Sequence, residues 1–313
     1  MKNNALLKAV FVIPPAVHLL DITGPAHVFY EATDYGADIR LFFCNVHANQ
    51  QKVQSSASLF LAELTDFDQM ELNAGDLIFV PGLDSTLLLD ENFLTTSRAF
   101  QYWLKKQHEN GVMICSVCTG AFLLAEAGLL DGKECTTHWK YIDRFKARYP
   151  AALLQTNRLF VKADSIYTSA GVASGIDLSL FLLEELYGSS FTVKIAKEIV
   201  VYTRRNEQDP QLSIFMQFRN HMDQRIHTVQ DLITQSFNKK ISIAHLADKV
   251  YMSPRNLTRL FRKTTQISIG DYTSKLRKER AMQMIAAGHT VQAAAQSCGL
   301  KSNNQLRAVM AKA

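Results

Sequence analysis

Cys115 and Cys118 stand three residues apart in ICSVCTGAFLLAEAGLL, a spacing that could serve a redox pair, half of a metal site, a nucleophile on a turn or core packing. Along a strand, residues three apart point to opposite faces, so the two thiols would not share a disulfide or a metal. A redox C-x-x-C pair normally opens a helix, whereas the helical pattern here begins later, near Gly120. We therefore expect Cys115 to lie in the core.

Cys118 precedes a run of small residues at the point where strand gives way to helix. We expect its thiol to be exposed at the strand end, where the N-terminus of the following helix favours the thiolate. It could then be a nucleophile, one wall of a small-molecule pocket, or an inert thiol prone to oxidation. Cys135 and His138 have no second pair at zinc spacing, so we expect no metal and no cofactor.

The elements that must position Cys118 alternate between strand and helix. Short β-rich runs are each followed by turn residues and a helical pattern, for example residues 93–108 after the third run. The runs are residues 10–13, 39–43, 77–80 and 112–115. This alternation predicts an α/β domain with a mainly parallel sheet, whose ligands bind outside the carboxyl ends of the strands.

Four segments, LLDITGP, VPG, SVCTGAFLLAEAGLLDG and TTHW, occur in this order. They resemble the PfpI-like branch of the class I glutamine amidotransferase-like superfamily across about residues 6–190. The resemblance implies a flavodoxin-like sheet with Cys118 on a sharp elbow, Asp21 close by and His138 as a third polar group. The candidates for an effector pocket at these strand ends are Asp21, Gly82, Cys118, Thr119 and His138.

Two positions depart from the catalytic members of that family. Its peptidases carry histidine directly after the elbow cysteine, where this chain has Thr119, and many catalytic members have glycine where it has Leu83. We therefore expect a binding pocket without turnover. The alternative is an enzyme, a cysteine-dependent hydratase or amidase in which Asp21 assists Cys118.

Other polar residues of the front half have local explanations. His18, His27 and His47 are isolated in the sequence, and we expect each at the surface or in a capping position. We expect Ser174, or a residue near it, to cap the apolar helix that Asp177 opens.

Charge divides the chain in two. Residues 204–313 hold 18 lysines and arginines against 7 acidic residues, whereas residues 1–203 hold 16 against 22. The basic part favours nucleic acid as a partner. No apolar run reaches the ~18 residues of a membrane span, and five cysteines without framework spacing fit a reducing cytoplasm. We expect a cytoplasmic protein without a membrane partner.

Residues 243–263 predict a helix, a tight turn and a second helix. Ala247 is small at the point where the two helices would cross. Ser253 is placed to cap the second helix, and Pro254 to occupy its first position. These features predict a helix-turn-helix unit.

The outward face of that second helix carries side chains that can read DNA. Arginine and asparagine bond to guanine and adenine edges in the major groove, so we expect base contacts from Arg255 and Arg259. We expect phosphate contacts from Lys263, Lys275 and Arg277. The full predicted DNA-binding set is Arg255, Asn256, Thr258, Arg259, Arg262, Lys263, Lys275, Arg277, Asn303, Asn304 and Arg307.

A weaker copy of this pattern follows in VQAAAQSCGLKSNNQLRAVM, with Gly299 in the turn and Ser302 as the cap. Residues 272–287 predict the helix that connects the two copies. Together they resemble the DNA-binding domains of the AraC/XylS family across about residues 225–310. That resemblance implies that each second helix enters the major groove, one turn of DNA apart.

A PfpI-like domain followed by an AraC-type domain resembles the GlxA-like transcriptional regulators. The resemblance implies a regulator that binds double-stranded promoter DNA, senses a small-molecule effector and forms a homodimer. We expect residues 1–205 to be the effector-binding and dimerisation domain and residues 206–224 a linker. We expect residues 225–313 to be an all-α DNA-binding domain with two helix-turn-helix units.

Overall fold

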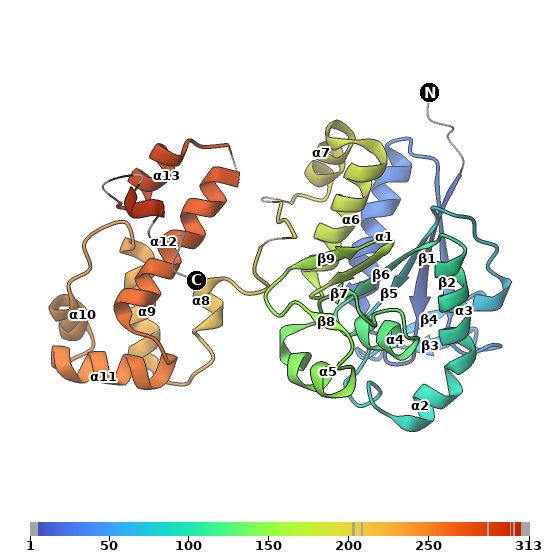
Figure 1. Ribbon diagram of the computed structural model, residues 1–313, viewed down its shortest axis with the longest axis horizontal. Helices are drawn as coiled ribbons and strands as arrows, with labels where there is room; N and C mark the ends of the chain where they lie inside the picture. Colours follow the sequence, from blue (N-terminus) through green and yellow to red (C-terminus); the bar gives the residue numbers. More distant parts are fainter. Residues whose placement is uncertain are drawn as a thin grey trace. The chain divides into compact units, whose positions relative to one another are not determined.

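A computed structural model describes residues 6–201, 204–207, 209–286, 288–300, 302 and 304–307. The chain forms two compact units, divided between Gln211 and Leu212. The first unit combines a sheet with helices, and the second is helical (Figure 1). None of the helices in the described part of the chain is both long and apolar enough to cross a membrane.

A six-stranded sheet organises the first unit, in the order β2-β1-β5-β6-β10-β9. Its strands are β1 (Leu7–Ile13), β2 (Ile39–Asn45), β5 (Leu77–Val80), β6 (Met113–Val117), β9 (Phe160–Ala163) and β10 (Ile166–Ser169). Neighbouring strands pair in parallel, except that β9 runs antiparallel to β10. The four strands expected from the sequence are present, and the prediction of a mainly parallel α/β domain is confirmed.

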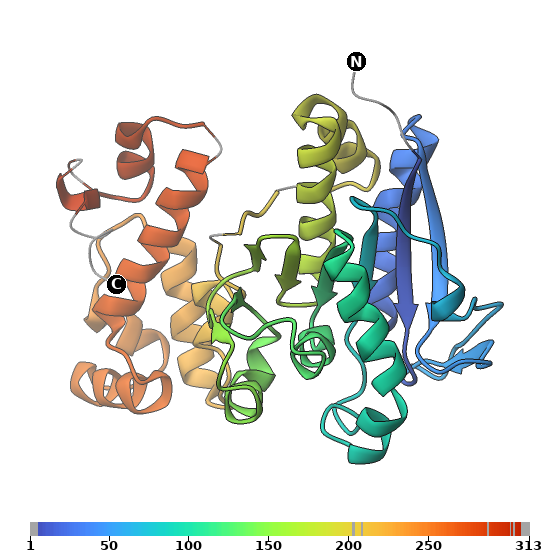
Figure 2. The ribbon, with the colours of Figure 1, turned by 45° about the vertical axis from the view of Figure 1, so that its right-hand side comes forward.

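Helices cover both faces of this sheet (Figure 2). On one face lie α1 (Leu19–Asp34), α6 (Ala173–Tyr187) and α7 (Ser189–Glu198). On the other lie α2 (Glu91–Thr96), α3 (Arg98–Glu109), α4 (Gly120–Glu126) and α5 (Ile142–Arg148). Two short strand pairs complete the unit, namely β3 (Lys52–Gln54) with β4 (Phe60–Ala62) and β7 (Glu134–Cys135) with β8 (Leu153–Leu154).

One local expectation for the first unit needs correction, and another is wrong. The helix expected over residues 93–108 is divided at Ser97, whose hydroxyl donates to the carbonyl of Leu94 at 3.3 Å. Ser174 does not cap α6 but lies inside its first turn. Its hydroxyl accepts the N–H of Gly171 at 2.7 Å and so stabilises the preceding loop.

The second unit contains six labelled helices in its described part, and residues 304–307 are also helical. The labelled helices are α8 (Ile214–Gln217), α9 (Gln224–Ser236), α10 (Ile243–Lys249), α11 (Pro254–Thr265), α12 (Ile269–Ala286) and α13 (Val291–Ser297). Helix α12 contributes Tyr272 to one apolar core and Ala281 to a second, so it connects the two small hydrophobic cores of the second unit. It begins three residues before the expected start because Ser268 accepts the N–H of Asp271 at 3.1 Å.

The segment expected to be a linker, residues 206–224, is partly structured. Ile214 and Phe218 pack against the core of the second unit, and the N–H of Ile214 donates to the Glu279 carboxylate at 3.1 Å. Apolar side chains in a mainly polar segment gain free energy by this burial. The division between the two units, after Gln211, lies within the expected linker, and the residues from Ile214 on belong to the second unit.

Candidate functional site

The turn after β6 holds Cys118 in a left-handed backbone conformation. Its φ angle is 59°, in a region that residues other than glycine seldom adopt and that often occurs at functional sites. The N–H of Cys118 donates to the carbonyl of Ser169 on β10 at 3.0 Å, and α4 begins two residues after Cys118. The elbow implied by the family resemblance is present.

Three glycines allow the backbone to close around this elbow. A Cβ atom on Gly120 would clash with the carbonyl oxygen of Val80, and one on Gly82 would clash with the Asp21 carboxylate. A Cβ atom on Gly171 would lie 2.8 Å from the sulfur of Cys118. Any side chain at these positions would push the elbow out of place.

Asp21 joins the loops that meet at the elbow. The carboxylate is buried in the first turn of α1, with 1% of the residue exposed. Its Oδ2 atom accepts the N–H of Gly82 at 3.1 Å, and its Oδ1 atom accepts the N–H of Val172 at 2.8 Å. Both oxygens of this buried charge are therefore hydrogen-bonded, as burial requires.

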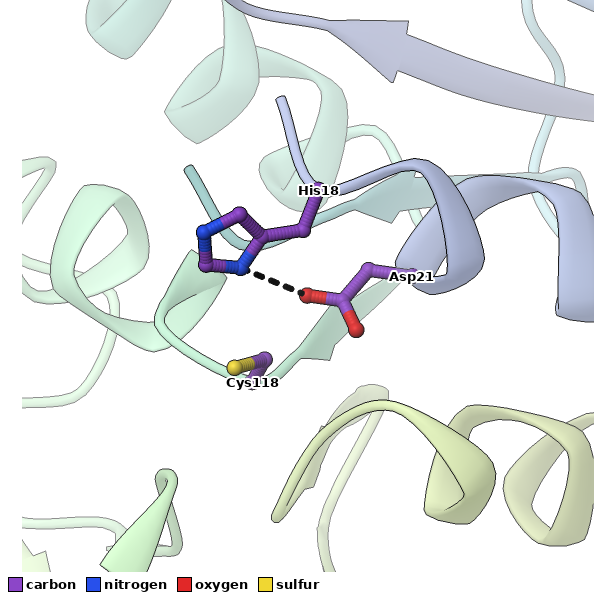
Figure 3. Close-up of side chains that lie close together, drawn as sticks. All are labelled: His18, Asp21 and Cys118. Atoms are coloured by element: carbon purple, nitrogen blue, oxygen red, sulfur yellow. Dashed lines mark ion pairs between the residues drawn. The ribbon is translucent and has the colours of Figure 1, made fainter. Parts of the chain in front are cut away.

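His18 is a site residue that the sequence reasoning missed. Its Nδ1 atom lies 3.7 Å from Oδ2 of Asp21, and both side chains come together with the Cys118 thiol (Figure 3). His18 occupies the N-cap position of α1, one of the two expected placements, but it makes no side-chain cap hydrogen bond and it is not isolated. The available signal was the i, i+3 spacing to Asp21 at a helix start, which places the two side chains on one face.

The Cys118 thiol is protonated rather than activated. Burial, and then the charge of Asp21, raise the pKa of the thiol far above its usual range. Only 3% of the residue is exposed, so the expectation of an exposed thiolate is wrong. A hydrogen bond from the backbone of Thr119 lowers the pKa, but desolvation outweighs it.

The amides of the Pro-Gly turn are already occupied. Thr119 Oγ1 accepts the N–H of Leu83 at 3.2 Å, and Asp21 accepts the N–H of Gly82. An enzyme of acyl-transfer type needs free backbone amides aimed at a developing anion. Here these two amides have partners within the protein.

His138 lies on the loop beside the elbow. Thr137 Oγ1 donates to the carbonyl of Cys118 at 3.0 Å, which anchors the loop. Burial lowers the pKa of the His138 imidazole, while the nearby Asp21 carboxylate acts in the opposite direction. The half-buried ring is therefore neutral at neutral pH. Because its Nδ1 atom accepts the N–H of Lys140 at 3.4 Å, Nε2 carries the proton and can donate one hydrogen bond to a ligand.

In the second unit, α11 has the features expected of a recognition helix. Ser253 accepts the N–H of Asn256 at 3.3 Å, and Pro254 occupies the first turn. Leu257 and Phe261 are fully buried in the core shared with α10, and Ala247 of α10 is buried beside them. The remaining face of α11 is thereby turned to solvent.

All six α11 residues predicted to contact DNA are exposed. They are Arg255, Asn256, Thr258, Arg259, Arg262 and Lys263. In the second copy, Asn304 and Arg307 are also exposed, while Leu306 between them is buried. Asn303 lies outside the described residues.

Arg277 has a structural role that the sequence did not indicate. Its Nε atom donates to the carbonyl of Phe237 at 2.7 Å, and an Nη atom donates to the carbonyl of Lys239 at 2.8 Å. The guanidinium therefore satisfies carbonyls of the segment just after α9 instead of facing outward. Lys275, two residues earlier on α12, is partly exposed.

Two family models match the chain. Residues 7–185 match the DJ-1/PfpI family, and residues 246–313 match a helix-turn-helix domain. The chain belongs to the DJ-1/PfpI family and carries a helix-turn-helix domain after it. The two-domain resemblance drawn from the sequence is confirmed.

Similar proteins include regulators and one enzyme. The chain is 31% identical over 215 residues to the HTH-type transcriptional regulator CdhR of Pseudomonas aeruginosa, covering 68% of this chain and 62% of that protein. It is 32% identical over 192 residues to the HTH-type transcriptional regulator GbdR of the same species, covering 61% and 52%. It is 33% identical over 184 residues to the isonitrile hydratase of Pseudomonas putida, covering 58% and 73%.

The matches to the two regulators thus span 52–62% of their length. Among solved structures, a putative transcriptional regulator protein from Vibrio parahaemolyticus has a TM-score of 0.55 at 18% identity, covering 63% of this chain and all of that chain. An AraC family transcriptional regulator from Pseudomonas putida has a TM-score of 0.52 at 21% identity, covering 62% and 99%. These structural matches show a shared fold.

Proposed function

We propose that this chain is a sequence-specific DNA-binding transcriptional regulator whose front domain senses a small metabolite. The observation that carries the proposal is the exposed polar face of α11, which is capped, positioned by a buried face and basic. Relatives named as HTH-type transcriptional regulators support it. Such a protein acts where the DNA lies, in the cytoplasm.

In this proposal α11 enters the major groove. Arg255 and Arg259 lie four residues apart on one face of α11 and reach base edges. Lys263, at the other end of the helix, neutralises phosphate, as does Lys275 on α12. Asn304 and Arg307 act in the same way from the second copy of the motif. A homodimer would present the two helix-turn-helix motifs of each chain twice, which suits operators with repeated half-sites.

The effector pocket in this proposal lies at the elbow, between His18, Asp21, Cys118 and His138. The half-exposed imidazoles offer hydrogen bonds to a ligand, while the buried carboxylate holds the surrounding loops. Binding there changes DNA affinity only if the ligand prefers one arrangement of the protein over another.

The decisive experiment is a DNA-binding assay with the full chain. Fragments recovered by genome-wide DNA pull-down would be titrated with the purified protein at two salt concentrations. We expect specific binding that weakens with salt, because phosphate contacts release counterions. A matched variant with Arg255→Ala and Arg259→Ala should lose specific binding, whereas Arg225→Ala on α9 should not. A protein that ignores duplex DNA even at low ionic strength would refute the proposal.

A second candidate function is a cysteine-dependent hydratase or amidase. The grouping of His18, Asp21 and Cys118 at a strained elbow favours it, as does the 33% identity to an isonitrile hydratase. The protonated thiol and the occupied amides of Gly82 and Leu83 count against it. We expect no turnover of isocyanides, nitriles or amides. Turnover that disappears in Cys118→Ala would establish the enzyme instead.

A further inference from the structure

Three different metal-ligand atoms meet at the elbow. An imidazole nitrogen of His18, a carboxylate oxygen of Asp21 and the sulfur of Cys118 all lie within 4.8 Å of one another (Figure 3). Two of the three side chains are buried, and they come from two separate parts of the chain, the start of α1 and the turn after β6. Among the described residues, this is the group whose donor atoms could hold a metal ion.

We propose that His18, Asp21 and Cys118 bind a thiophilic divalent cation of the zinc type. Magnesium and calcium prefer oxygen ligands alone, whereas zinc accepts sulfur, nitrogen and oxygen together. Three protein ligands with an open fourth position are typical of zinc sites that bind a further ligand. The role of this metal rests on the proposed function, because the metal would lie in the proposed effector pocket.

The distances suit such an ion after a small closure. Zinc bonds of 2.0–2.3 Å at tetrahedral angles would hold neighbouring ligand atoms about 3.5 Å apart. His18 Nδ1 and Asp21 Oδ2 are 3.7 Å apart already. The longest separation in the group is no more than 4.8 Å, so the ligands need to close by about 1 Å.

The surroundings of the group fit this role. Each oxygen of Asp21 accepts one backbone N–H, from Val172 or Gly82, and keeps a further lone pair for a cation. These bonds orient the carboxylate in the manner of an outer coordination shell. The carboxylate and the thiolate together would neutralise the two charges of the ion. On binding, the thiol proton of Cys118 leaves to solvent, so affinity should increase with pH.

A cation would reach the three ligand atoms from the side of His18. The His18 side chain is 32% exposed, while Asp21 and Cys118 are closed off from solvent. An incoming cation would therefore meet His18 first, and its fourth position would face outward. Water or a donor atom of the effector would complete the coordination.

The test is a titration of the metal-free full chain with Co²⁺, followed by displacement with Zn²⁺. We expect one Co²⁺ per chain, a thiolate-to-cobalt charge-transfer band in the near ultraviolet and release of about one proton per ion bound. Cys118→Ser should abolish the band. His18→Ala should reduce affinity by at least about 10-fold. His27→Ala, at an exposed histidine within α1, is the matched control and should bind as the parent does.

Either of two results would overturn the inference, namely no charge-transfer band in the parent protein or equal affinity in His18→Ala and the parent. Because Asp21 also holds two loops, Asp21→Asn would be interpreted only after circular dichroism shows a parental fold. DNA binding is measured separately. A chain that binds its operator but no metal refutes the metal site alone, and a chain that binds metal but no DNA refutes the proposed function alone.

Discussion

At the scale of single residues, the elbow brings Cys118 and Asp21 together but keeps the thiol protonated. Cys118 has the strained backbone of a nucleophile, yet burial and the Asp21 charge raise the pKa of its thiol. The same carboxylate accepts two backbone N–H groups and therefore also acts as a structural tie. Such a pair suits ligand or metal recognition better than nucleophilic attack.

The first residue-scale prediction concerns thiol reactivity. Iodoacetamide should modify Cys118 slowly at neutral pH, since little thiolate is present. Asp21→Asn removes a charge that raises the pKa, so modification should begin at lower pH than in the parent. The measurement is mass spectrometry of the peptide that carries Cys118 over a pH series. Asp34→Asn, exposed on the same helix, is the control, and rapid modification of the parent at pH 7 would contradict the prediction.

The second residue-scale prediction separates Arg277 from Lys275. Arg277→Ala leaves two carbonyls just after α9 without their charged donor, so it should destabilise the second unit by about 1–3 kcal/mol. Lys275→Ala should leave stability unchanged but weaken binding to all DNA sequences and lower the salt slope by ~1. Chemical denaturation and binding at several salt concentrations would check both. If Lys275→Ala lost stability and Arg277→Ala only weakened DNA binding, Lys275 would be the structural residue and Arg277 the phosphate contact.

At the scale of elements, α11 links local sequence to the proposed function. Its cap and its three buried side chains, Leu257, Phe261 and Thr265, fix the position of the helix, so the basic face is left exposed to solvent. Helix α12 joins the two small cores of the second unit through Tyr272 and Ala281. The spacing of the two predicted helix-turn-helix units therefore depends on one continuous helix of 18 residues.

The first element-scale prediction concerns recognition. Arg255→Ala and Arg259→Ala should each cost ~1–3 kcal/mol at the specific site and relax preference at one base position. Affinities for the operator and for single-base variants of it would measure this change. If both variants discriminate between sequences as the parent does, neither arginine belongs to the reading face.

The second element-scale prediction concerns the helix cap. Ser253→Ala removes the acceptor for the N–H of Asn256 and should destabilise the second unit by about 0.5–2 kcal/mol. Ser253→Asp should retain most of the parental stability, since aspartate also caps helices. Thermal unfolding of the three proteins would compare them, and an unchanged midpoint in Ser253→Ala would show that the cap contributes nothing.

At the scale of the whole molecule, the end of the first unit is bonded to helix α6 and to the loop that holds Thr137. Arg205 contacts the buried Asp177 carboxylate at 2.5 Å, and Arg204 contacts Glu184 at 2.7 Å, both on α6. The Gln211 side chain donates to Thr137, on the loop beside Cys118. Arg204 and Arg205 are thus bonded to α6, and Gln211 is bonded to the loop beside the elbow.

The whole-molecule prediction tests this attachment. Asp177→Asn removes the charge that holds Arg205, so trypsin should cut after Arg204 and Arg205 faster than in the parent. Burial raises the pKa of Asp177 and Arg205 opposes the shift, so the ion pair should also be lost as pH falls through that raised value. Fragment mass spectrometry would follow the cleavage. Asp164→Asn, at an exposed ion pair, is the control, and equal rates in all three proteins would exclude the attachment.

The sequence by itself determined the features that depend on neighbours along the chain. Alternation of β-rich and helical runs gave the parallel sheet, and Ser253, Pro254 and the spacing of Leu257 and Phe261 gave α11. These are short-range signals, because caps and periodicity act within one or two turns.

The tertiary structure alone decided how distant residues combine. The N–H that Asp21 accepts from Val172 lies 151 positions away, and the carbonyls that Arg277 satisfies lie 38 and 40 positions away. Burial of Cys118 likewise arises from loops that the fold brings around it. Protonation state and access depend on such packing, because desolvation is a property of the surrounding atoms and not of the residue type.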